Sequence, residues 1–263
     1  MNSSNEKITS LPAPIKEFFL EVDGISRFTW QFFKTVLKPP YEFSEIVRQS
    51  FIIGYKSLSL VTVTGFIMGL VLTIQSRPTL ARFGAESWLP GMVAISLIRE
   101  IGPVITALIC AGKIGSGIGA ELASMQVTEQ IDAMEVSGTN PFKYLVVTRV
   151  MAAVFMVPLL VIYADAVGLF GSYIAVNILG NVGLRLYFSQ AVGHLDFVDV
   201  LPAFIKTFFF GFAISIIACY KGYTSNKGTE GVGLAANSAV VVGSLCVFII
   251  DMIAVQLASY FMY

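Results

Sequence analysis

Charged residues are scarce in this sequence. Lys, Arg, Asp and Glu make up 13% of the 263 residues, whereas a soluble domain has about 25%. Hydrophobic residues make up 56%, and the mean hydropathy is +0.77. The 17 basic residues balance 17 acidic ones, so there is no basic surplus to attract nucleic acid. These values exclude an ordinary soluble domain and indicate an integral membrane protein.

Residues that bind metals or form disulfides are also few. His194 is the single histidine, and Cys110, Cys219 and Cys246 lie in apolar runs without CxxC or Cys/His spacing. Such thiols are typical of small buried side chains, so we expect neither a metal site nor a disulfide. No cleavable signal peptide is expected after the polar start MNSSNEKITS. The spanning helices themselves would target the chain.

Five stretches are apolar and long enough to cross a bilayer, which needs about 20 residues of helix. They lie at about residues 57–76, 88–112, 144–179, 203–221 and 234–262. The third is longer than a bilayer requires and contains Pro158, which predicts a tilt, a kink or an extension beyond the membrane. We therefore predict an all-α integral membrane protein with a transmembrane domain over residues 57–263.

Residues 1–56 form a separate N-terminal segment in this prediction. Between residues 12 and 38, apolar residues recur at three- and four-residue spacing with charged residues between them. An amphipathic helix lying in the membrane interface fits that pattern, and Pro39 and Pro40 would end it. A second such segment, from residue 41 to about residue 56, leads into the first span.

The basic residues are distributed unevenly along the chain. Seven Lys and Arg precede the first span, and alternate connecting segments carry 12 and 3 in total. By the positive-inside rule the N-terminus is cytoplasmic, and five crossings place Tyr263 outside. Segments 113–143 and 222–233 would then face the cytoplasm. No internal repeat is evident and five spans are about half of a typical transporter core, so we expect a homodimer.

The glycine-rich segment 112–120 does not fit a nucleotide-binding loop. A Walker motif needs glycine five residues before its Gly-Lys pair and Ser or Thr after it, but Ala107 and Ile114 stand there. A dinucleotide fingerprint would need a preceding strand, and an apolar helix precedes this segment. Small residues that allow close helix packing explain it better.

Four acidic residues follow within one predicted cytoplasmic loop. Leu122, Met125, Glu129 and Asp132 fall three or four residues apart, and Thr128 is a good start for a helix that ends near Gly138. A short amphipathic helix here would suit contact with a cytoplasmic partner, and a merely solvated loop is the alternative. The residues predicted to make that contact are Glu121, Met125, Glu129, Gln130, Asp132 and Glu135.

Five charged residues lie within the apolar runs: Arg99, Glu100, Asp165, Lys206 and Asp251. Each costs several kcal/mol if unpaired, so they should face a partner or a wet cavity. Arg99 and Glu100 point about 100° apart on a helix, so each should find its counterpart on another helix. We expect Lys206 and Asp251 among those counterparts, although Lys206 could instead snorkel outward near Pro202. Structural pairing and contact with substrate both remain open.

Several motifs are similar to those of the MlaE permease family. Their order and spacing hold over residues 90–245, and the EQIDA stretch is the most specific. Three departures are mild: Lys113 stands where Arg is usual, Ala123 where Gly is usual, and Thr148 where Pro is common. The motifs are REIGP at 99–103, GKIGS at 112–116, AEL at 120–122, EQIDAME at 129–135 and GTEGVG at 228–233.

The resemblance implies a dimeric ABC permease of the bacterial inner membrane. It would move phospholipid between that membrane and the periplasm or outer membrane and so maintain lipid asymmetry. The chain would be no enzyme and bind no cofactor, because a separate cytoplasmic ATPase would bind ATP and Mg²⁺ and dock on a coupling helix at residues 121–135. A periplasmic MCE-domain protein, embraced by the N-terminal helix, and a small cytoplasmic STAS-type regulator would be further partners.

Two other functions compete with this interpretation. An ion-coupled secondary transporter would use Glu100, Asp165 or Asp251 as proton carriers, but five spans without an internal repeat argue against it. A lipid-modifying membrane enzyme would need paired His or Asp residues near the interface. The sequence has no such pair and no Ser/His/Asp or Cys/His arrangement.

Overall fold

The chain folds as a bundle of long helices. The computed structural model describes residues 13–262 except residues 40, 180–181, 194 and 226–227, and the described part contains no strand. His194 and Tyr263 lie outside the described residues. The elements are α2 Ala13–Val36, α3 Phe43–Arg82, η1 Glu86–Trp88, α4 Leu89–Ser96, η2 Leu97–Ile101, α5 Gly102–Cys110, η3 Ala111–Gly115, α6 Ser116–Val127, α7 Gln130–Val136, η4 Phe142–Val147, α8 Thr148–Leu179, α9 Leu184–Gly193, α10 Phe197–Tyr223 and α11 Thr229–Met262.

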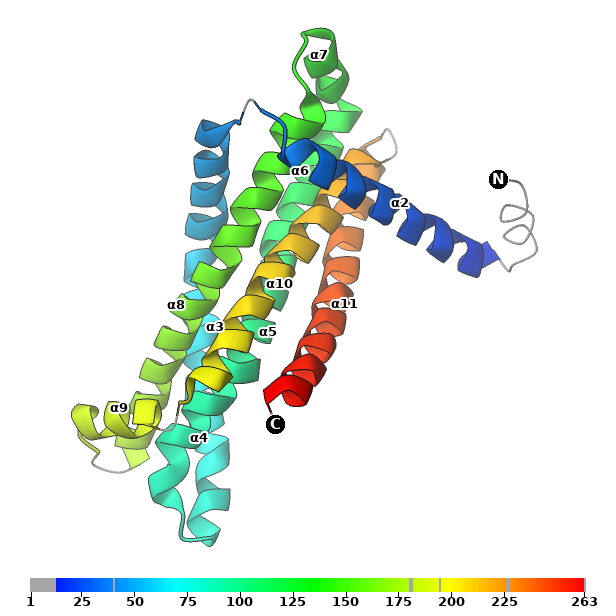
Figure 1. Cartoon of the computed structure of the whole chain (residues 1–263). Coiled ribbons are helices and arrows are strands. Elements are labelled where there is room, and N and C mark those ends of the chain that lie inside the picture. The colour runs from blue at the N-terminus through cyan, green and yellow to red at the C-terminus, as the bar shows by residue number, and fades with distance from the viewer. Residues whose placement is uncertain (1–12, 40, 180–181, 194, 226–227, 263) are drawn as a thin grey trace.

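Five helical stretches are long and apolar enough to cross a membrane, which confirms the predicted all-α membrane fold. They run in alternating directions, so that α7 lies at one end of the bundle and α4, α9 and the C-terminus lie at the other (Figure 1). The third stretch has 37 residues, more than a bilayer requires, as its long apolar run predicted, and it contains Pro158. The five stretches are Phe43–Arg82, Glu86–Val127, Phe142–Ile178, Phe197–Tyr223 and Thr229–Tyr260.

The first span begins earlier than the sequence analysis predicted. The helix α3 runs for 40 residues without a break, so the second amphipathic segment and the first apolar run form one helix. The predicted division of the chain at residue 56 therefore falls inside α3. A buried stripe at every fourth residue, from Glu45 to Thr73, explains the continuity, because one face of α3 packs against the bundle along this whole length.

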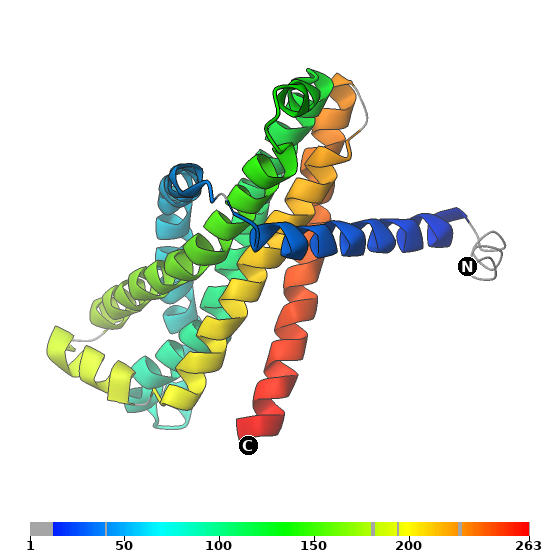
Figure 2. The same ribbon diagram turned by 45° about the horizontal axis from the view of Figure 1, so that its top comes forward.

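The helix α2 crosses the bundle at a large angle to the spans and projects beyond it (Figures 1 and 2). Phe28 and Phe32 anchor it, at 7% and 3% exposure, and the Phe28 ring meets the Phe142 ring edge-on at 4.9 Å between centroids. Other large apolar side chains of α2, including Trp30 and Phe33, stay exposed. An exposed aromatic face of this kind suits a helix that lies in a membrane interface.

The second span is also longer than predicted. The helical stretch continues through η3 and α6 to Val127 and is longer than a bilayer requires, so the start of the cytoplasmic segment at residue 113 stays a prediction. The small residues of 112–120 lie in this helix and allow a close approach to α11. A methyl group on Gly119 would lie 3.2 Å from both the Ala235 carbonyl oxygen and the Ala239 Cβ. The expected close packing is therefore confirmed at Gly119, whereas Gly112 and Gly117 have open space where a side chain would begin.

Small residues also bring α3 and α8 together. An added Cβ on Gly65 would lie 2.9 Å from the carbonyl oxygen of Ala164, and one on Gly69 would collide with the carbonyl of Gly168. Because the backbones are this close, buried hydroxyl groups can pair between the helices, and Thr73 Oγ1 lies 2.6 Å from Ser172 Oγ. Helices in lipid associate through such packing and hydrogen bonds.

We expect Gly69→Ala to lower the thermal stability of the purified protein, because its methyl group would collide with the Gly168 carbonyl. Overpacking costs about 1–3 kcal/mol, which exceeds the gain of about 0.5–1 kcal/mol from placing Ala in a helix. Gly233→Ala on α11 is the matched control, because its methyl group would meet no atom within 4 Å. Thermal unfolding in mild detergent measures both, and equal stability of the two variants would contradict close α3–α8 contact.

Candidate functional site

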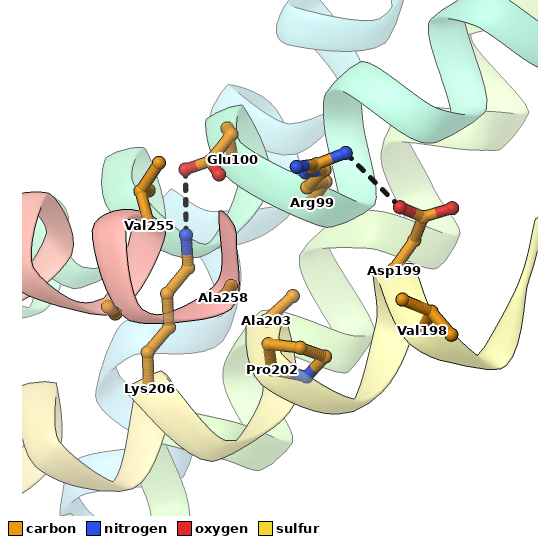
Figure 3. A pocket seen from close by; sticks show the side chains of 10 residues that line it. Arg99, Glu100, Val198, Asp199, Pro202, Ala203, Lys206, Val255 and Ala258 are labelled. Carbon is orange, nitrogen blue, oxygen red and sulfur yellow. Dashed lines mark hydrogen bonds and ion pairs between the residues drawn. The ribbon is translucent and has the colours of Figure 1, made fainter. Parts of the chain in front are cut away.

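A buried lysine joins three spans. The Lys206 side chain on α10 is 4% exposed, and its Nζ donates hydrogen bonds to Glu100 Oε2 and Asp251 Oδ1, each over 2.8 Å. Glu100 belongs to η2 and Asp251 to α11; Figure 3 shows the bond to Glu100. The expected pairing of Glu100 with Lys206 is confirmed, whereas Asp251, expected to pair with Arg99 or Glu100, instead contacts Lys206. The alternative of a snorkelling Lys206 is wrong, because α10 continues outward past Pro202 to Phe197 and the ammonium stays between helices.

Arg99 points away from Glu100 and has a different partner. Its Nη1 donates to Asp199 Oδ1 on α10 over 3.3 Å (Figure 3). Both Arg99 and Glu100 lie in the wide π-helical turn η2, and such turns frequently mark functional sites. The sequence analysis missed Asp199 because it assigned residues up to 202 to an external loop. Asp199 precedes Lys206 by about two helical turns, so extending that span outward would have placed both on one face.

Asp165 forms no hydrogen bond with this network in the described part of the chain, although it lies close enough to interact electrostatically with Lys206. Its Oδ1 atom on α8 is buried and has no hydrogen-bond partner in the part of the chain that the structure describes. Gly102 makes room for it, since a methyl group there would collide with Asp165 Oδ1. Of the five predicted intramembrane charges, the structure thus brings four to one place and sets Asp165 against the backbone of α5.

A charged pocket and an apolar groove meet at this network. Arg99, Glu100, Asp199 and Lys206 line the pocket, and the first two have the most exposed side chains, at 34% and 37%. The groove has a volume of about 450 Å³, runs between α10 and α11 and is almost entirely apolar. The pocket has a volume of only about 20 Å³, room for a water molecule. An amphipathic ligand could therefore place its polar end at the mouth of the pocket, beside Arg99 and Glu100, and its hydrocarbon in the groove. Four residues line both: Pro202, Lys206, Ala254 and Ala258.

The short helix α7 is the second candidate site. It covers Gln130–Val136, close to the predicted Thr128–Gly138, and stands at the end of the bundle (Figure 1). Glu129 has the left-handed backbone angle φ 57°, which turns the chain between α6 and α7. The predicted stripe from Leu122 to Asp132 therefore does not lie on one helix, which is a correction. Ile131 anchors α7 at 3% exposure, while Asp132 and Glu135 are exposed.

Glu121, another of the predicted contact residues, forms an ion pair within the chain. Arg149 on α8 is 2% exposed, and its Nη2 donates to Glu121 Oε1 over 2.9 Å. Its Nη1 donates to the Leu145 carbonyl oxygen, also over 2.9 Å. The sequence analysis gave Arg149 no role. The apolar residues on both sides of it could have indicated burial.

Comparisons with known proteins find similar sequences over most of the chain. The family model Permease MlaE matches residues 46–257. A probable ABC transporter permease protein of Rickettsia typhi is 41% identical over 241 residues, which cover 92% of this chain and 93% of that protein. A probable ABC transporter permease protein of Synechocystis is 34% identical over 84% of both chains. The chloroplastic protein TRIGALACTOSYLDIACYLGLYCEROL 1 of Arabidopsis thaliana is 34% identical over 86% of this chain and 64% of its own length.

We expect Lys206→Met to destabilise the protein, because it leaves the carboxylates of Glu100 and Asp251 without their shared cation. Removing one partner of a buried ion pair costs about 3–5 kcal/mol. The triple variant Lys206→Met, Glu100→Gln, Asp251→Asn removes the uncompensated charges and should recover about half of that loss or more.

Thermal unfolding in detergent compares the single and triple variants, with Lys16→Met on α2 as the control for loss of a cation outside the spans. If the single and triple variants lose the same stability, the three side chains do not act as one ion-pair network.

Proposed function

The chain belongs to the MlaE permease family, and we propose that it is the membrane subunit of an ABC transporter that moves phospholipid and so maintains lipid asymmetry. The observation that carries the lipid assignment is the junction of the charged pocket with the apolar groove between α10 and α11. A phospholipid has a charged headgroup joined to long hydrocarbon chains, so its two parts match the two surfaces. A lipid name also occurs among the relatives, in the Arabidopsis protein.

In this proposal the exposed guanidinium of Arg99 meets the lipid phosphate. Arginine matches the geometry of phosphate oxygens better than a lysine ammonium does. Lys206 donates hydrogen bonds to Glu100 and Asp251, so in this proposal it holds the pocket together and does not itself bind the phosphate. Glu100, the other exposed charge, would face the cationic part of a zwitterionic headgroup.

The energy source in this proposal is a separate cytoplasmic ATPase that binds ATP and Mg²⁺, while this chain binds no cofactor. The exposed acids of α7 would be its coupling contact, held at a fixed angle by the turn at Glu129. Ile131 is buried and holds α7 on the bundle, while Asp132 and Glu135 are exposed. A docked partner could therefore contact these acids and move α7 together with the bundle.

Two copies of the chain would enclose the lipid path in the bacterial inner membrane. This arrangement places the N-terminus in the cytoplasm and the C-terminus in the periplasm, as the distribution of Lys and Arg supports. Large apolar side chains on the outer face of α11, such as Leu245, Phe248 and Met252, are exposed in the single chain and suit contact with lipid or a second copy. A periplasmic MCE-domain protein and a small STAS-type regulator complete the proposed assembly.

Asp132→Lys combined with Glu135→Lys should abolish co-purification of the ATPase with the tagged chain, because both changes reverse charge on the exposed face of α7. The permease itself should keep its thermal stability, since both side chains are exposed. The matched control Glu17→Lys with Asp23→Lys reverses two charges on α2. An ATPase retained by the α7 variant would contradict the coupling contact, and a wild-type chain that purifies without any ATPase would contradict the ABC assignment.

The paired substitution Arg99→Gln with Asp199→Asn should lower ATP-driven phospholipid transfer from proteoliposomes about tenfold, because a charge-assisted contact with phosphate is lost. Ala254→Phe should have a similar effect by filling the junction of pocket and groove. Ala81→Phe, on an exposed part of α3, is the matched control. Normal transfer by both site variants would show that lipid does not pass through this pocket.

A further inference from the structure

A second groove lies near the other end of the bundle, between α3 and the helix formed by η3 and α6. Its volume is about 310 Å³. In each wall the intervals between lining residues are one or three, which is the spacing of one helix face, so the walls are two facing helix stripes. They are Gln49, Ile52, Ile53, Lys56 and Ser57 of α3, and Lys113, Ile114, Gly117, Ile118 and Glu121 of η3 and α6. We refer to this surface as the α3–α6 groove.

Two lysines face each other across the α3–α6 groove. Lys56 and Lys113 are both exposed, and among the described residues neither ammonium lies within 4.0 Å of a carboxylate. Glu121 is the one acid of the lining, and its charge is offset by the buried guanidinium of Arg149, 2.9 Å away. The groove therefore presents two cations whose charge no acid of its own lining offsets.

The floor of the groove offers a hydroxyl group and open space. Ser57 is 1% exposed, lines the groove, and its Oγ has no hydrogen-bond partner in the described part of the chain. A buried hydroxyl without a partner is costly, and a ligand that accepts its hydrogen bond would remove that cost. Opposite it on the α6 wall, a methyl group added to Gly117 would meet no atom within 4 Å.

The position of the lysines along their helices points to the level of lipid headgroups. Lys56 directly precedes the apolar run 57–76, and Lys113 directly follows the apolar run 88–112. By this pattern both ammonium groups would stand where hydrocarbon ends, and the end of the bundle that carries α7 is also the end at which α3 begins and α6 ends (Figure 1). Four isoleucines complete the lining: Ile52, Ile53, Ile114 and Ile118.

We propose that the α3–α6 groove binds the phosphate group of a phospholipid in the leaflet on the α7 side, between Lys56 and Lys113, with Ser57 donating a hydrogen bond. The adjoining isoleucines would contact the glycerol end of the acyl chains. Free phosphate has the same anionic chemistry, but it would gain nothing from those apolar walls. The groove is separate from the pocket at Arg99, and its identification as a lipid site rests on the proposed function.

Photolabelling of the full chain tests this proposal without the need for transport. The chain is reconstituted in phosphatidylcholine vesicles with a trace of phosphatidylglycerol that carries a diazirine near the glycerol, and labelled peptides are identified by mass spectrometry. Label is expected on the peptides that contain residues 49–57 and 113–121. Lys56→Gln with Lys113→Gln should reduce it about tenfold or more, while Lys56→Arg with Lys113→Arg should retain it.

Gly117→Leu provides a second test that leaves both charges in place. It should also reduce labelling, because the leucine side chain would fill the groove. The matched control Lys16→Gln with Lys34→Gln removes two cations from α2, on the same side of the bundle. Labelling that persists in the Lys56/Lys113 glutamine variant, or that falls equally in the α2 control, would overturn the proposal.

Two further arms identify the source of the phosphate. A diacylglycerol with the same diazirine should label the groove weakly, and equal labelling would show that phosphate is not recognised. Millimolar inorganic phosphate should leave lipid labelling intact, and complete displacement would show a site for the free anion instead. A chain that transports phospholipid without groove labelling would overturn this inference alone, whereas groove labelling without transport would leave it standing and count against the proposed function.

Discussion

The need to neutralise one ammonium between apolar helices governs one half of this structure. An unpaired lysine inside a membrane costs several kcal/mol, so Lys206 requires the carboxylates of Glu100 and Asp251 at hydrogen-bonding distance. This requirement fixes α10 against η2 and α11 in both rotation and height. The groove between α10 and α11 and the charged pocket beside it both follow, because they are lined by the residues that this fixed arrangement brings together.

The other end of the bundle depends on a second buried cation. Arg149 on α8 holds Glu121 on α6, and α6 leads through the turn at Glu129 into α7. The same α8 packs on α3 through glycines and the Thr73–Ser172 hydroxyl pair. A partner that docks on α7 would therefore act on α8 through an ion pair. Lipid supplies no hydrophobic drive between helices, so these few polar and small residues have to maintain the packing.

The sequence was sufficient to predict the features that follow from the length of apolar runs and from the cost of burying charge. Twenty-residue apolar runs predicted the five spans, and the cost of intramembrane charge predicted the pairing of Lys206 with Glu100. The sequence did not predict the features that depend on packing between helices. The amphipathic pattern of residues 41–56 suggested a separate interfacial segment, but its Glu45 and Gln49 are buried and belong to the stripe that runs along α3. Asp199 and Arg149 were missed because their burial depends on helices distant in sequence.

The second span connects the two charged regions and also limits how a headgroup can travel between them. Arg99 lies in the π-helical turn η2 and Lys113 in the π-helical turn η3, roughly 20 Å apart along the axis at about 1.5 Å per residue. Between these turns α5 carries one hydroxyl group, that of Thr106, and it is 1% exposed. A phosphate moving along α5 would therefore cross hydrocarbon without a polar contact, at a cost of several kcal/mol. Under the proposed function, transport in this conformation is closed along that helix. Movement of the spans, driven from outside the chain, or polar groups from a second copy must then supply the path.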